Sequence, residues 1–318
     1  MKPLQRTMTI ATGIAALAMM TAVPFFGQGE KQGQGQVVVT ILPKKDGATL
    51  PEVTPESIKL KVNGKDTSIT NVVAPKDGGS VELVLLIDNS LRTSLGTQLS
   101  EIEKFIRTLP PNVRLAMAYM QYGQAAIASP FSTDRENSLK ALHLPSGTPG
   151  SSGSPYFCIS DLAKRWPQSG GPVRREILMI TDGVDKYNPR YDPEDPYVQA
   201  AIKDSTRAGI VIYSLYWRDQ GRFSGTGYAN NAGQNLLVQV TEATGGKNFW
   251  SGFSNPVSFA PYFDELTRRI QNQYELSFVA PYNGKATAQP IRLKLNVPGA
   301  EITSPQQVFV ARPGIAEN

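Results

Sequence analysis

The sequence predicts an α/β protein. We expect a doubly wound, mostly parallel sheet flanked by helices, with a small β-region built from segments near both ends of the chain. Three observations support this. Residues 83–87 and 177–180 are apolar at every position, as in strands buried on both faces. Strand-like and helix-like segments alternate around these two runs. Near both ends of the chain, apolar residues alternate with polar ones, as in half-buried strands.

The first residues read as a targeting segment. Lys2 and Arg6 precede an apolar stretch, which predicts a signal peptide over residues 1–27. We therefore expect a secreted or periplasmic protein with no membrane span in the mature chain. A linker rich in Gly and Gln is expected over residues 28–36.

Composition narrows the function classes. The formal net charge is +5 at pH 7, and the basic residues are scattered without an interleaved aromatic stripe, so a nucleic-acid partner is not expected. A single cysteine, Cys158, excludes an intrachain disulfide. The fold must therefore be stabilised by its core and not by cross-links.

The β-region is predicted from residues 37–78 and 274–312. Residues 57–62 alternate in polarity and lead into Asn63-Gly64, a pair typical of a tight hairpin turn. The later segment alternates in the same way, and we expect it to pair with the earlier one. The predicted strands are 36–42, 57–62, 68–73, 274–279, 291–297 and 307–310.

Residues 79–273 form the predicted α/β domain. Its first helix has apolar residues at helical spacing and ends before a pair of prolines; others begin at a proline or end at a glycine. The helices are expected at 94–109, 155–166, 196–208, 233–244 and 255–273, and further strands at 113–120 and 210–216.

Each of the two apolar runs leads to an aspartate, Asp88 and Asp182. Ligands of open α/β sheets lie at the carboxyl ends of the strands, so both carboxylates are expected at one edge. Asp88-Asn89-Ser90 together with Thr181-Asp182-Gly183 resembles the von Willebrand factor A domain. The order of elements and the Gly-Gly pair before Phe249 resemble, more narrowly, the related secreted proteins of acidobacteria.

The resemblance implies a metal-ion-dependent adhesion site for Mg²⁺ or Mn²⁺. Asp88, Ser90 and Asp182 match the metal ligands. Ser154 best matches the hydroxyl of the second loop, residues 146–154, with Thr148 as the alternative. A carboxylate of the partner would complete the coordination. Taken singly, each of these residues is also an ordinary turn or cap residue.

Arg92 departs from the pattern, because it stands where the family has a serine. Its guanidinium could pair with the two aspartates as an internal cation and exclude a metal. It could also point outward and leave Thr93 or Ser94 to supply the hydroxyl. Asp185 is expected as a surface turn residue, the alternative being that it accepts a hydrogen bond from a metal-bound water.

Two loops that follow strands of this sheet are rich in residues enriched at protein interfaces. They are expected to rim the site, unless their aromatic side chains pack down locally. The predicted rim residues are Tyr187, Tyr191, Trp217, Arg222, Phe223 and Tyr228.

Catalysis has little support in the sequence. The only histidine is His143, and Cys158 falls on the apolar face of a predicted helix, as a buried structural thiol would. We therefore expect a non-enzymatic binding or adhesion module for a protein or acidic ligand. One alternative is a metal-free structural or assembly subunit whose degenerate site is filled by Arg92. A metal-assisted hydrolase is a further alternative.

Overall fold

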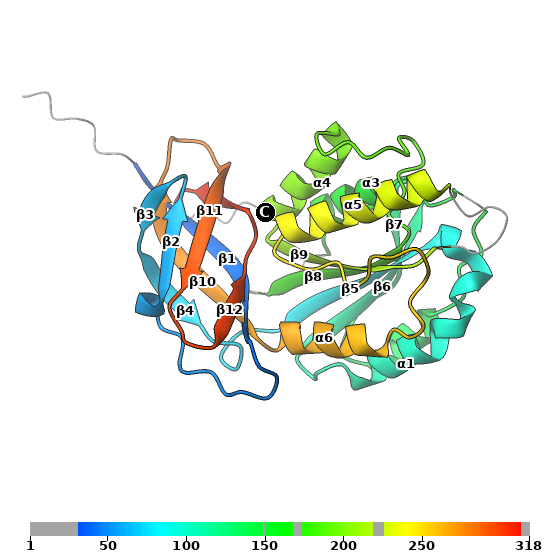
Figure 1. The fold of residues 1–318 in the computed structure, drawn as a ribbon, viewed down its shortest axis with the longest axis horizontal. Helices are drawn as coiled ribbons and strands as arrows, with labels where there is room; N and C mark the ends of the chain where they lie inside the picture. The colour runs from blue at the N-terminus through cyan, green and yellow to red at the C-terminus, as the bar shows by residue number, and fades with distance from the viewer. Residues whose placement is uncertain (1–30, 149, 168–172, 219–225, 313–318) are drawn as a thin grey trace, which may run out of the picture. The chain divides into compact units, whose positions relative to one another are not determined.

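The computed structural model describes residues 31–148, 150–167, 173–218 and 226–312. Among these residues the strands form two sheets, one of eight strands and one of five. Figure 1 shows the eight-stranded sheet beside a layered unit in which helices cover both faces of the five-stranded sheet.

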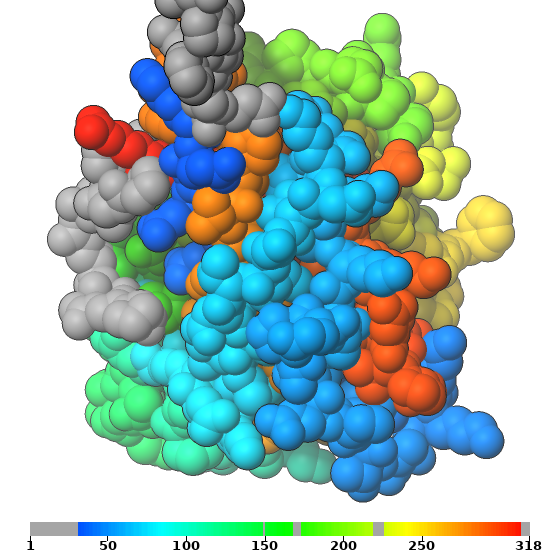
Figure 2. Space-filling model, turned by 90° about the vertical axis from the view of Figure 1, so that its left-hand side faces the viewer, coloured from blue at the N-terminus to red at the C-terminus, as the bar shows by residue number. Residues whose placement is uncertain are grey.

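The eight-stranded sheet is antiparallel at every described pairing, with the order β3-β2-β11-β13-β1-β10-β4 and with β12 paired to β1. It combines strands from both ends of the chain, which lie side by side in Figures 1 and 2. Its strands are β1 (Gln32–Pro43), β2 (Ile58–Val62), β3 (Lys65–Thr67), β4 (Ile69–Val73), β10 (Gln273–Pro281), β11 (Thr287–Leu295), β12 (Ala300–Thr303) and β13 (Gln307–Ala311).

This sheet curls around a core of its own. Leu60 from one end of the strand order and Phe278 near the other end belong to the same buried cluster. In β2 alternate residues point inward: Ile58, Leu60 and Val62 are buried and the two lysines between them are exposed. A short 3₁₀ helix, Pro55–Ser57, leads into β2.

The five-stranded sheet has the order β7-β6-β5-β8-β9. Four strands are mutually parallel, and β7 runs antiparallel to β6. Its strands are β5 (Val81–Asp88), β6 (Val113–Gln121), β7 (Gln124–Ser132), β8 (Arg174–Thr181) and β9 (Ile210–Tyr216).

Both faces of this sheet are covered, which explains the apolar runs. In β5, Leu85 and Ile87 face the side packed by α1 and α6, whereas Val84 and Leu86 face α3, α4 and α5. The helical elements are η2 (Asn89–Gln98), α1 (Leu99–Thr108), α2 (Arg135–Ala141), α3 (Pro155–Lys164), α4 (Pro196–Arg207), α5 (Gly227–Ala243) and α6 (Ala260–Ile270).

The predicted fold class is wrong for the chain as a whole. The larger sheet is the antiparallel one, and the β-region is therefore not a small appendage to a doubly wound parallel sheet. The five-stranded sheet is itself mixed because of β7. The continuous apolar runs dominate the sequence pattern on which the fold class was predicted. A half-buried strand has fewer apolar residues, so its alternating pattern is a weaker signal.

Several element boundaries also differ from the prediction. Strand β1 begins at Gln32, inside the expected linker, because its alternate residues are buried even where they are glycine. Strand β7 and helix α2 were not predicted. Most residues of β7 are not buried, as is common in an edge strand. No helix within the described ranges is long and apolar enough to cross a membrane.

Candidate functional site

The site is built where β5 and β8 end. These strands are adjacent and parallel, so Asp88 and Asp182 emerge at the same edge. Asp88 is fully buried and joins the two strands. Its Oδ1 accepts a hydrogen bond from the Ser90 backbone N–H (2.7 Å), and its Oδ2 accepts one from the Thr181 hydroxyl (2.7 Å). The carboxylate is therefore fixed by its own loop and by the neighbouring strand.

The second loop reaches this centre through Ser152. The Ser90 and Ser152 hydroxyl oxygens lie 2.7 Å apart, and the Ser152 backbone N–H donates to the Ser90 hydroxyl at 3.1 Å. The predicted second-loop ligand, Ser154, instead donates its hydroxyl to Asp185 (2.8 Å). The alternative ligand, Thr148, is exposed.

The third loop begins at Asp182, directly after β8, and folds back onto the Asp182 side chain. The carboxylate accepts a hydrogen bond from the Val184 backbone N–H at 2.8 Å, and its other oxygen lies 3.0 Å from the ammonium of Lys186. The Lys186 backbone N–H donates to the carbonyl of Gly153 (3.1 Å), which ties the third loop to the second. The cation beside Asp182 is thus a lysine four residues further along the chain, a spacing visible in the sequence but not used in the prediction.

Asp185 supports the loops from within. Its side chain is 2% exposed, so its expected surface position is wrong. One carboxylate oxygen accepts the Ser154 hydroxyl, and the other accepts the backbone N–H of Tyr187 (2.8 Å). Asp185 therefore holds the second and third loops in register.

The electrostatics follow from burial. The pKa of the Asp88 carboxyl is raised because burial removes water from its charged form and because the Asp182 carboxylate lies nearby. Hydrogen bonds from Thr181 and Ser90 and the charge of Lys186 act in the opposite direction. Two buried carboxylates at one edge favour a compensating positive charge.

In this arrangement the oxygen atoms of the site are poorly placed to coordinate a divalent cation. All four carboxylate oxygens of Asp88 and Asp182 already accept a hydrogen bond or face an ammonium. Mg²⁺ demands near-octahedral oxygen coordination, and a fixed ammonium beside Asp182 would repel it. In the described part of the chain, no group of three or more His, Cys, Asp or Glu residues is placed to hold a metal ion. Metal binding through Asp88, Ser90 and Asp182 stays a prediction.

Arg92 lies at a strained point of the first loop. Its backbone has φ 56° and ψ −151°, a conformation that residues other than glycine rarely adopt. The side chain is half-buried. Its predicted role as the substituting cation stays a prediction, whereas the ion pair at Asp182 is made by Lys186.

The predicted rim divides into three groups. Tyr187, Tyr191 and Tyr228 are exposed, with 63%, 46% and 67% of their surface accessible. Trp217 is buried, donates its indole N–H to Ser94 (3.2 Å) and packs edge-on against a core phenylalanine, so its placement in the rim is wrong. Arg222 and Phe223 lie outside the described residues.

An aromatic cluster adjoins the second and third loops and was only partly predicted. Phe157 of α3 stacks on Tyr187 with ring centroids 5.5 Å apart, and meets the edge of Tyr197 at 4.6 Å. Tyr197 is 54% exposed, and Tyr122 in the β6–β7 turn is 71% exposed. The turn is held against the second loop, because the Tyr122 backbone N–H donates to the carbonyl of Ser151 (2.7 Å). The Tyr-Gly pair between two strands could have indicated this exposed turn.

The residues considered for catalysis are not arranged for it. Cys158 is fully buried in α3, as predicted, and burial raises the pKa of its thiol well above its ordinary value. His143 is exposed and stacks on the ring of Tyr119, with centroids 4.1 Å apart. Both have structural surroundings that account for them.

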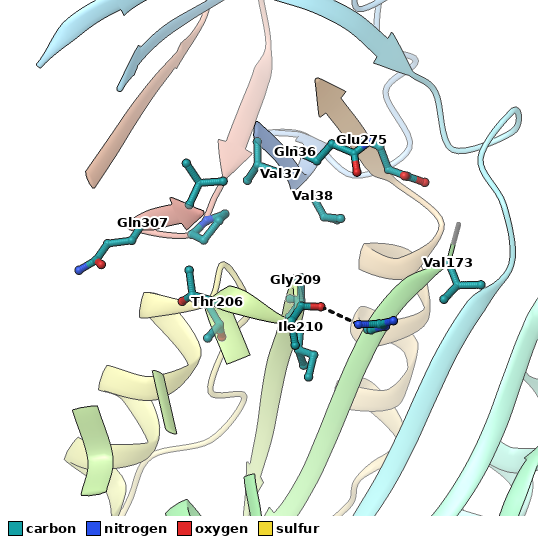
Figure 3. A pocket seen from close by; sticks show the side chains of 15 residues that line it. Gln36, Val37, Val38, Val173, Thr206, Gly209, Ile210, Glu275 and Gln307 are labelled. Carbon is teal, nitrogen blue, oxygen red and sulfur yellow. Dashed lines mark hydrogen bonds between the residues drawn. The ribbon is translucent and has the colours of Figure 1, made fainter. Parts of the chain in front are cut away.

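A cavity of about 480 Å³ lies away from this edge, between β1, β10 and β13 on one side and the beginnings of β8 and β9 on the other. Figure 3 shows Val37 and Val38 facing Gly209 and Ile210 across it, with Glu275 at its margin. Arg175 also lines it and donates to the Ala208 carbonyl (3.2 Å). None of the predicted site residues lines this cavity.

The sequence matches no family model and no curated protein. Among solved structures, an aerotolerance-related membrane protein from Bacteroides fragilis is similar with a TM-score of 0.42 and 17% identity, over 60% of this chain and 98% of that one. BatB from Bacteroides thetaiotaomicron gives a TM-score of 0.42 and 16% identity, over 60% and 97%.

A protein described as the SpRpn10 VWA domain is similar with a TM-score of 0.34 and 11% identity, over 48% of this chain and 82% of that one. All these TM-scores lie below 0.5, so the likenesses carry no argument about this chain. The narrower kinship with acidobacterial proteins has no support among them. The functional argument therefore rests on the geometry of the site.

Proposed function

We propose that this chain is a non-enzymatic binding module that recognises a partner protein, or an acidic ligand, at the carboxyl edge of the five-stranded sheet. One observation carries the proposal: exposed tyrosines adjoin the second and third loops of a closed, internally bonded polar centre. Tyr122, Tyr187 and Tyr197 present large amphipathic surfaces to solvent around loops that are fixed from beneath.

The exposed rings suit protein recognition. Tyrosine contributes contact area with little loss of side-chain entropy, and it is enriched in the energetically dominant parts of interfaces. Phe157 supports Tyr187 and Tyr197 from below, so their rings are positioned before a partner arrives. Preorganisation of this kind lowers the entropic cost of binding.

The polar centre favours a structural role over turnover. The Asp88 carboxylate is buried and accepts hydrogen bonds from two neighbours, so it does not face solvent as a general base would. Tyr187 lies in the third loop, where its backbone N–H donates to Asp185, and the turn that carries Tyr122 is hydrogen-bonded to Ser151 of the second loop. We therefore assign the centre to loop positioning and the rim to partner contact.

Site-specific photo-crosslinking tests the proposal. A benzoylphenylalanine residue at position 122 or 187 should crosslink a discrete protein from an extract of the producing cells, because these positions contact the partner. Val279, exposed on β10 of the other sheet, provides the control position. Crosslinks of equal yield from position 279, or none from either tyrosine position, would contradict it. Repeating the experiment with chelator separates metal-dependent from metal-free binding.

A further inference from the structure

Lys186 is held at both its backbone and its side chain. Its backbone N–H donates to the Gly153 carbonyl at 3.1 Å, and its ammonium lies 3.0 Å from Oδ2 of Asp182. About a quarter of the side chain is exposed (26%), and the Asp182 side chain is 10% exposed. The side chain is therefore only partly exposed, and its ammonium is placed beside a carboxylate of the site.

The charges at this edge make the lysine necessary. Asp88 and Asp182 are both buried, and their close placement is costly unless a positive charge lies between or beside them. A lysine ammonium is a compact charge with three donors, so it can satisfy a carboxylate oxygen in a small space. A divalent cation and this ammonium would compete for the same oxygen of Asp182.

We propose that Lys186 is the resident cation of the carboxyl-edge site and makes that site independent of divalent metal. Replacing Lys186 by an uncharged residue converts the site into one that binds Mn²⁺ or Mg²⁺. Partner recognition at this edge then proceeds without metal; that consequence rests on the proposed function, whereas the cation itself is tested without any partner.

The experiment is calorimetric titration of the full chain with Mn²⁺, alongside Lys186→Met, Lys186→Gln and Lys186→Arg. Lys164→Met is the matched control, because Lys164 also lies 3.0 Å from an aspartate, Asp204, away from the site. We expect no saturable binding by the wild type, Lys186→Arg or Lys164→Met up to about 1 mM, the weak end of extracellular calcium modules. Lys186→Met and Lys186→Gln should bind one Mn²⁺ at least tenfold more tightly than this limit.

A thermal readout complements the calorimetry. Without metal, Lys186→Met should melt below the wild type, because two buried carboxylates lose their counter-charge, and Mn²⁺ should raise its Tm but not that of the wild type. Adding Asp88→Asn should abolish the gained binding. Saturable Mn²⁺ binding by the wild type overturns the proposal, as does absence of binding in both neutral variants when their circular dichroism is native. Failure of the crosslinking experiment alone would leave this result unaffected.

Discussion

Gly233 of helix α5 lies against the backbone carbonyl of Asp182: a Cβ added at position 233 would meet that oxygen at 2.4 Å. The Asp182 carbonyl and the α5 backbone that would carry the Cβ cannot move apart without distorting the main chain. Gly233→Ala should destabilise the protein by about 2 kcal/mol, a typical cost of overpacking, and lower its Tm by roughly 5 °C. Gly227→Ala, at the open first residue of the same helix, is the control and should melt like the wild type. Equal melting of both variants would contradict the contact.

Glu82 and Glu136 offer a comparison of a buried and an exposed ion pair. Each lies 2.6 Å from an arginine, but the Glu82 side chain is 0% exposed and that of Glu136 is 60% exposed. Glu82 also accepts the Trp166 indole N–H at 2.9 Å. Glu82→Ala should cost about 3 kcal/mol because it strands these partners, whereas Glu136→Ala should cost under about 1 kcal/mol. Denaturant unfolding measures both, and similar losses would refute the role of burial.

Glu176 should make stability depend on pH. Burial raises the pKa of this carboxyl from its ordinary 4.5 to about 7, opposed by the charge of Arg174 and by the Gln273 side chain. The folded chain then keeps a proton that the unfolded chain releases, so this stability is complete below about pH 4.5 and lost as pH rises through about 7. Glu176→Gln lacks the titration. The Tm of this variant relative to the wild type should therefore rise by a few degrees between pH 5 and pH 8; a difference constant with pH would argue against it.

Cys158 should be inert in the folded protein. Its thiol is fully buried, and burial raises its pKa, so little thiolate forms and reagents cannot reach it. Ellman's reagent at pH 8 should detect no thiol in the native protein and one per chain after denaturation, in keeping with the single cysteine. Rapid reaction of the native protein would show that helix α3 opens readily.

The sequence was most informative where burial is complete. The runs leading to Asp88 and Asp182 predict buried strands that end at one edge of a sheet, and β5 and β8 are parallel and, beyond that prediction, directly paired. The size of the antiparallel sheet was missed, because half-buried strands share their pattern with surface loops. The extension of β1 to Gln32 carries no apolar run, and most residues of β7 are exposed.

The candidate site was harder to predict because side-chain direction depends on loop dihedrals. Trp217 and Tyr187 both lie after strands of the five-stranded sheet. Trp217 is nevertheless buried in the core, whereas Tyr187 is exposed. Lys186 and Arg92 both carry a positive charge, and the folded third loop places the ammonium of Lys186 3.0 Å from Asp182. Spacing along the chain placed the carboxylates but not their counter-charge.

Strand β1 pairs with β10, β12 and β13 and with no strand that precedes them among the described residues. During synthesis on the ribosome, β1 therefore emerges long before any of its neighbours, and more than two hundred residues separate Pro43 from Gln273. An unpaired strand of this length is an aggregation hazard. The early chain needs protection by a chaperone or rapid completion, and a product shortened before Gln273 would leave β1 permanently without a partner.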